Sequence, residues 1–194
     1  MTRTCCIGLV MIFLLQMAVN CFTPIWSLYT ASIGGDLRSA GIAILIFTWG
    51  TALIAAISPL INKKLNIPEQ TLLIVGIILN IISVIAYFYV DNIYTFYAVQ
   101  GLLTLGAGIQ IPAFYVIYEK NISRNEKGFA WGALDASFYF AVGLGSILSA
   151  FIFYHLTIYA VFTLMLVLVI ISLFLALWFI ATSSPPQKPG GENP

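Results

Sequence analysis

The sequence predicts an all-α membrane protein with six transmembrane helices, and three observations support this prediction. Of the 194 residues, 61% are hydrophobic and only 8% are charged, whereas soluble domains carry about 25% charged residues. The hydrophobic residues form six continuous runs, each about as long as the roughly 20 residues that a helix needs to cross a bilayer. The runs do not alternate between polar and apolar residues, which disfavours a β-barrel.

The six predicted spans are 5–23, 40–61, 70–90, 94–118, 128–153 and 157–181. We expect one six-span domain over residues 1–181. Residues 182–194 are rich in Pro, Gly and Ser, which predicts a disordered cytoplasmic tail. The first run follows Arg3 and could also be a signal peptide, but it is long and lacks a clean cleavage site of small residues.

Cations are distributed unequally between the two sides of the predicted bundle. Seven of the eight lie on the side that carries both termini, and only Arg38 lies on the other side. Short loops rich in Lys and Arg stay in the cytoplasm, so we expect a cell-membrane protein with both termini cytoplasmic and one fixed orientation. The seven are Arg3, Lys63, Lys64, Lys120, Arg124, Lys127 and Lys188.

Polar side chains in the first, fourth and fifth spans recur every three or four residues, so each set falls on one helix face. In lipid, such a face turns toward protein or water. The faces either hydrogen-bond to neighbouring helices or line a shared polar cavity. We favour the cavity, because amide and aromatic groups recur at mid-depth on all three spans. The predicted cavity residues are Gln16, Asn20, Gln100, Thr104, Tyr115, Trp131, Asp135 and Tyr139.

Asp135 is the one acidic residue inside the predicted fifth span, about 10 Å beyond Gly128 at 1.5 Å per residue. An unpaired ionised Asp at that depth costs a few kcal/mol, so it should be protonated, paired or hydrated. It either bonds to Trp131, Tyr139 or water near the interface, or it has a functional role. That role would be contact with a cation or substrate, or a titration that couples pH to conformation.

A second face of the fifth span carries small residues at intervals of four. Such a row lets two helix backbones approach closely, so it predicts a packing seam. We call this row the small-residue ridge. Its members are Ser137, Ala141, Gly145 and Ser149.

The stretch AVQGLLTLGAGIQIPAFYVIYEKNISRNEKGFAWG, residues 98–132, resembles the fourth span and the following loop of the major facilitator superfamily of transporters. In that family a basic residue, two variable positions, Gln and Gly open the helix, and a charged loop ends in Gly-x-Ala-x-Gly. The corresponding residues here are Tyr97, in place of the basic residue, and Gln100, Gly101, Gly128, Ala130 and Gly132.

Two shorter stretches resemble the same family with substitutions. SPLINKK, residues 58–64, stands where the loop between the second and third spans normally reads Gly-x-Leu-x-Asp-Arg, with Asn62 for Asp and Lys63 for Arg. GSILSA, residues 145–150, stands where the family has Gly-Pro-x-x-Gly-Gly, with Ser146 for Pro. Together with a sixth span nearly free of polar residues, these motifs are similar to the amino-terminal half of the family's fold.

The resemblance implies one major-facilitator-type six-helix repeat. In full-length members two such halves are parallel repeats, and the substrate lies between them near the midplane. We therefore expect a parallel homodimer, in which the second and fifth spans of one copy meet the fifth and second of the other. The small-residue ridge is expected at or near that dimer seam.

The function that the resemblance implies is secondary transport of a small solute by alternating access. The predicted cavity has one acid and no base, which favours a neutral or cationic solute. The alternative is a membrane scaffold or assembly partner that keeps the fold without transport. An intramembrane enzyme is disfavoured, because the spans contain no nucleophile with a base and no set of metal ligands. We expect no cofactor, metal or nucleic-acid partner, only the lipid bilayer, a second copy and an unknown small-molecule substrate.

Overall fold

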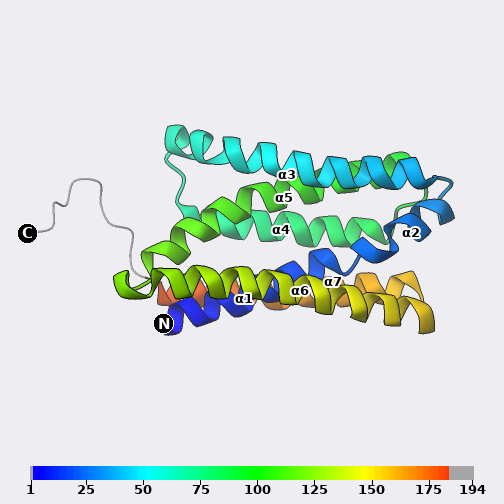
Figure 1. Cartoon of the computed structure of the whole chain (residues 1–194). Coiled ribbons are helices and arrows are strands. Elements are labelled where there is room, and N and C mark those ends of the chain that lie inside the picture. Colours follow the sequence, from blue (N-terminus) through cyan, green and yellow to red (C-terminus); the bar gives the residue numbers. More distant parts are fainter. Residues whose placement is uncertain (1, 184–194) are drawn as a thin grey trace, which may run out of the picture.

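The computed structural model describes residues 2–183, which contain seven α-helices, two short 3-10 helices and no strand. Most of the long helices run close to the long direction of the bundle, and α5 crosses it diagonally (Figure 1). The helices are α1 (Arg3–Asn20), α2 (Trp26–Ser32), α3 (Leu37–Leu65), α4 (Glu69–Tyr87), α5 (Ile93–Lys120), α6 (Lys127–His155) and α7 (Ile158–Thr182), with η1 (Thr23–Ile25) before α2 and η2 (Arg124–Glu126) before α6.

Six segments of residues 2–183 are long and apolar enough to cross a membrane, as the sequence predicts. The first segment runs from Arg3 to Ser32 and is longer than predicted, because α2 continues it beyond residue 23. Pro24 lies in the first turn of η1, where its missing N–H leaves no hydrogen bond unmade. Of the predicted tail, Thr182 belongs to α7 and the residues after Ser183 lie outside the described part of the chain.

The helices pack as two groups of three. In one group α1 contacts α6 and α7; in the other α5 contacts α3 and α4. Contact between α4 and α7 joins the groups, and Figure 1 shows α3 and α6 at opposite edges of the bundle. Each group thus has one central helix, α1 or α5, with two helices against it.

Both ends of the described chain lie at the same end of the bundle (Figure 1). The hydroxyl of Thr4 donates a hydrogen bond to the carbonyl of Thr182 at 2.9 Å, and Thr2 donates to the carbonyl of Asn121 at 3.1 Å. The α3–α4 and α5–α6 connections lie at this end as well. It therefore carries the described cations that the sequence analysis assigns to one side, while Arg38 lies at the start of α3, at the opposite end.

The small-residue ridge packs inside one chain, which corrects its predicted place at a dimer seam. Ala141, Gly145 and Ser149 are buried, and Ser137 is half-buried. A Cβ added to Gly145 would lie 2.8 Å from the carbonyl oxygen of Met17, so the backbone of α1 covers the ridge directly. A second chain cannot reach this row while α1 occupies it, and a contact between chains must use another face of α6.

The least buried spans are α3 and α6. Only 11% of the most apolar window of the α3 span and 17% of that of the α6 span are buried, against 56% for the spans that contain α1 and α5. Large apolar side chains such as Trp49 and Leu53 on α3, and Phe140 and Ile147 on α6, are more than 60% exposed. These two helices therefore present most of their apolar surface to whatever surrounds a single chain.

Candidate functional site

Three of the predicted cavity residues meet in one small hollow between α1, α5 and α6. Gln16 comes from α1, Tyr115 from α5 and Asp135 from α6, and the hollow has a volume of about 40 Å³. Its remaining walls are apolar and come from Ile12, Ile111, Leu134 and Phe138. The first, fourth and fifth spans thus share a polar hollow, which is much smaller than the cavity that the three polar stripes predict.

Gln16 is oriented by its own helix. The side-chain amide of Asn20, one turn further along α1, donates to the backbone carbonyl of Gln16 at 2.8 Å and to its side-chain oxygen at 3.5 Å. Asn20 does not line the hollow itself. It lies in the layer behind Gln16 and restrains the position of the Gln16 amide.

Aromatic rings stand beside the hollow. The ring of Tyr115 meets the ring of Trp131 nearly at right angles, with centroids 5.8 Å apart, and Trp131 also meets Tyr118 at 6.0 Å. Perpendicular ring pairs of this kind are favourable, so they hold Tyr115 against the start of α6. Trp131 and Asp135 are one helical turn apart on α6, and Trp131 therefore supports the wall of the hollow without lining it.

Asp135 is exposed at the surface of the single chain, and within residues 2–183 it makes no hydrogen bond and no ion pair. The predicted bonds to Trp131 and Tyr139 are therefore not formed. Tyr139 is 73% exposed and packs edge-on against Phe138, with its ring outside the hollow. Asp135 is thus free to meet water or another molecule from the open side.

The structure corrects the predicted role of Gln100 and Thr104, which are buried between helices. The hydroxyl of Thr104 donates to the carbonyl of Gln100 at 2.7 Å and lies 3.3 Å from the carbonyl of Ile46 on α3. The methyl group of Thr104 fills the space above Gly50, where a Cβ would come within 2.5 Å of it. Thr104 therefore belongs to the α3–α5 interface, and Gln100 is fully buried one turn before it.

The diagonal course of α5 explains why polar residues on one of its faces contact different helices. Thr104 and Tyr115 are three turns apart and share a helix face. The early part of that face meets α3, whereas the later part reaches α1 and α6, because α5 crosses the bundle at an angle (Figure 1). The spacing of polar residues in a sequence shows which face of a helix they share. Along a tilted helix, however, different neighbouring helices cover different parts of that face.

A larger cavity of about 470 Å³ lies at the end of the bundle, among the last turns of α3, the first turns of α4 and the middle of α5. Pro59 of α3 and Pro112 of α5 lie in facing helices at its wall. Proline inside a predicted helix is the sequence feature that could have indicated this cavity. The hydroxyl of Ser58 lies 3.3 Å from the carbonyl of Gly108, which Pro112 leaves without its usual helical donor.

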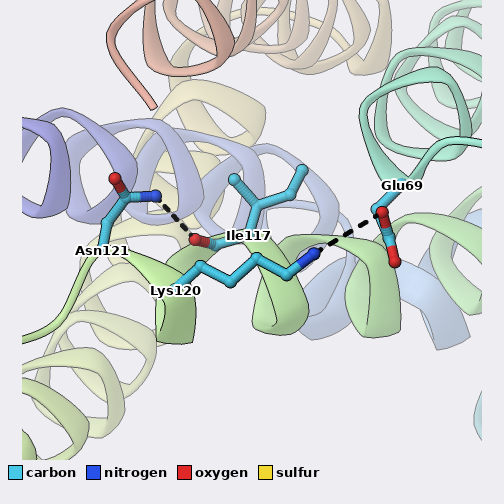
Figure 2. A network of polar contacts seen from close by, with 4 residues as sticks. All are labelled: Glu69, Ile117, Lys120 and Asn121. Atoms are coloured by element: carbon cyan, nitrogen blue, oxygen red, sulfur yellow. Dashed lines mark hydrogen bonds and ion pairs between the residues drawn. The ribbon is translucent and has the colours of Figure 1, made fainter. Parts of the chain in front are cut away.

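Two charged side chains line this larger cavity, Lys63 and Glu69, and the acidic one is already paired. Glu69, which lines it, forms an ion pair with Lys120 of α5 at 3.8 Å, and Asn121 donates to the carbonyl of Ile117 at 2.8 Å beside that pair (Figure 2). The cavity arises where helix ends diverge. The smaller hollow is the better candidate site, because it joins polar groups of three spans with an unpaired carboxylate.

Comparison with known proteins places this geometry in a family context. The family model for the Major Facilitator Superfamily matches residues 8–194. A search of curated proteins finds no match.

Two solved structures of POT family transporters resemble the fold. The in meso crystal structure of the POT family transporter PepTSo aligns with a TM-score of 0.77 at 16% identity, covering 98% of this chain and 41% of that one. The crystal structure of an auto inhibited POT family peptide transporter aligns with a TM-score of 0.68 at 18% identity, covering 98% and 40%. The chain thus spans about two fifths of the length of each protein.

Proposed function

The chain belongs to the major facilitator superfamily, and from this premise we propose that it is one six-helix unit of a secondary transporter. Two such units form the transport path, and a small neutral or cationic solute passes between them by alternating access. The proposal places the protein in the cell membrane with both termini in the cytoplasm, following the cations at that end of the bundle.

The observation that carries the proposal is the open hollow at Asp135. A polar group inside an apolar span normally faces protein or a water-filled cavity. Among the described residues of the single chain, Asp135 forms no hydrogen bond and no ion pair, and Tyr115 and Phe138 beside it are 43% and 39% exposed. A second unit opposite this surface would enclose the hollow between two sets of helices.

We propose that the second unit is another copy of this chain, arranged in parallel about a two-fold axis. The exposed faces of α3 and α6 support this arrangement, since they lie at opposite edges of the bundle and are the least buried spans. In a parallel pair, α3 of one copy meets α6 of the other on both sides. The contact between the two copies uses the exposed apolar faces of these helices. The small-residue ridge of α6 stays packed against α1 within each chain.

A flux assay in proteoliposomes tests the transport function. We expect uptake of at least one neutral or cationic solute, above that of empty liposomes, in a screen under an imposed pH gradient. Asp135→Asn should lower this uptake by about tenfold or more, because a hydrogen bond to a charged group contributes about 1.5–3 kcal/mol. The matched control is Asp91→Asn, which removes a carboxylate from the loop before α5.

Two results would contradict this proposal. Unchanged uptake in Asp135→Asn would remove Asp135 from the transport path. Absence of flux for every solute class, together with a tightly packed dimer that has no central cavity, would favour the alternative function, a membrane scaffold or assembly partner that retains the fold.

A further inference from the structure

We propose that the hollow formed by Gln16, Tyr115 and Asp135 binds a protonated primary amine, so that the solute is an organic cation whose ammonium end enters this site. The inference rests on the proposed transport function and names its substrate class.

The charge of Asp135 is not neutralised by the described part of the protein. The cations closest to it along α5 and α6 have other partners. Lys127 pairs with Glu119 at 3.2 Å, and Lys120 pairs with Glu69 at 3.8 Å. Arg3 stacks on the ring of Trp178, 5.6 Å from its centroid. A carboxylate kept without a counter-ion inside an apolar span attracts a cation from outside the chain.

The size of the hollow selects a small cationic group. The hollow of about 40 Å³ is small beside the roughly 300–1,000 Å³ of pockets that enclose whole ligands, and it has room for a polar end group such as an ammonium. It is too small for a whole organic solute. The rest of the molecule must therefore extend through the open side, toward the space that a second unit would enclose.

The lining of the hollow offers acceptors for the three N–H donors of an ammonium group. These acceptors are the carboxylate of Asp135, the phenol oxygen of Tyr115 and the amide oxygen of Gln16, which lies 3.5 Å from the side-chain nitrogen of Asn20. The aromatic faces of Tyr115 and Phe138 add a favourable environment for a positive charge.

The same lining disfavours other solute classes. An anion would be repelled by Asp135 and would find no basic side chain among the lining residues. A trimethylammonium group has no N–H to donate to these acceptors. A neutral alcohol satisfies the acceptors only in part and leaves the carboxylate charge in place.

Isothermal titration calorimetry on the full chain in phosphatidylcholine nanodiscs tests the inference. The probes are 2-phenylethylamine, 2-phenylethanol, phenylacetate and phenethyltrimethylammonium, which share one aromatic tail and differ in the polar end. Empty nanodiscs correct for partition into lipid. We expect saturable binding of 2-phenylethylamine, about tenfold or more tighter than that of the other three probes.

Variants connect this binding to the hollow. Asp135→Asn should weaken 2-phenylethylamine binding by about tenfold or more, and Tyr115→Phe should weaken it several-fold, while the matched control Asp91→Asn should leave it unchanged. If Asp135→Asn does not yield a monodisperse folded protein, Tyr115→Phe carries the test. Equal affinities for the amine and the alcohol, or unchanged amine binding in the hollow variants, would overturn the inference.

Binding and flux together separate this inference from the proposed function. If 2-phenylethylamine binds in an Asp135-dependent manner but no solute in the flux screen crosses proteoliposomes, the amine site stands and the transport function fails. If a neutral solute is transported while the amine does not bind, the transport function stands and the amine site fails.

Discussion

Single residues decide how closely the helices of this bundle approach. At the α4–α5 contact, a Cβ on Gly106 would meet the side-chain oxygen of Asn80 and would lie 2.7 Å from the carbonyl oxygen of Gly76. Asn80 is fully buried. Asn80 and Gly76 of α4 therefore take part in close packing against α5, and Gly106 is required there because no larger residue fits.

Gly106→Ala should destabilise the protein by about 1–3 kcal/mol, the usual cost of overpacking a tight core. The matched control is Gly101→Ala, in the same helix, where an added Cβ meets nothing within 4 Å. Thermal unfolding in detergent measures both variants. We expect a lower unfolding temperature for Gly106→Ala and an unchanged or slightly higher one for Gly101→Ala, and equal temperatures would contradict the proposed close contact.

The residues at which the helices begin and end depend on capping side chains as well as on the apolar runs. The start of α3 lies outside the apolar stretch, at Asp36, which caps the helix. The carboxylate of Asp36 accepts hydrogen bonds from the backbone N–H of Ser39 at 2.8 Å and from its hydroxyl at 2.9 Å. This capping box extends α3 by three residues beyond the predicted start at residue 40.

The cap predicts a pH dependence at the start of α3. Hydrogen bonds from Ser39 lower the pKa of Asp36 below its ordinary value of 3.8. A lowered folded-state pKa means that the carboxylate stabilises the fold above pH 3.8, and that this contribution is lost as pH falls through the folded-state pKa. Wild type should therefore unfold at a higher temperature than Asp36→Ala at pH 7, and the difference should shrink as the pH falls below 3.8.

The control for this titration is Asp36→Asn, because Asn is also a good N-cap but carries no titrating group. It should lose less stability than Asp36→Ala at pH 7. A difference between wild type and Asp36→Ala that stays constant down to pH 3 would contradict a role for the ionised cap.

At the scale of the whole molecule, the unpartnered surfaces of α3 and α6 matter most. The two helices have the same length, and each connects the two ends of the bundle. Leu53 lies 12 residues before the end of α3 at Leu65, and Phe140 lies 13 residues after the start of α6 at Lys127. Both are therefore at about the same depth, and both are more than 60% exposed.

A parallel homodimer predicts cross-linking between these positions. In a chain whose Cys5, Cys6 and Cys21 are replaced by Ala, the pair Leu53→Cys and Phe140→Cys should form a disulfide-linked dimer in membranes under mild oxidation. The matched control pairs Leu53→Cys with Ala141→Cys, because Ala141 is fully buried within one chain. Non-reducing electrophoresis measures the product. A dimer only in the control, or in neither pair, would contradict the proposed interface.

The sequence by itself determined the fold class. Six apolar runs of membrane length leave helices as the structure that satisfies every backbone hydrogen bond inside lipid, and the family motifs around Gln100, Gly128 and Gly132 indicated the superfamily. The sequence also placed Gln16, Tyr115 and Asp135 on faces that could meet, because helical periodicity is set by local geometry.

Only the tertiary structure decided which neighbour covers each face. Helical periodicity gives the direction of a side chain relative to its own axis but not the position of the next axis. Because α5 is tilted, Thr104 lies in the interface with α3, whereas Tyr115 lies in the hollow. The approach of α1 enclosed Gly145 within one chain, since two backbones can meet closely wherever both present small groups, whether those belong to one chain or to two.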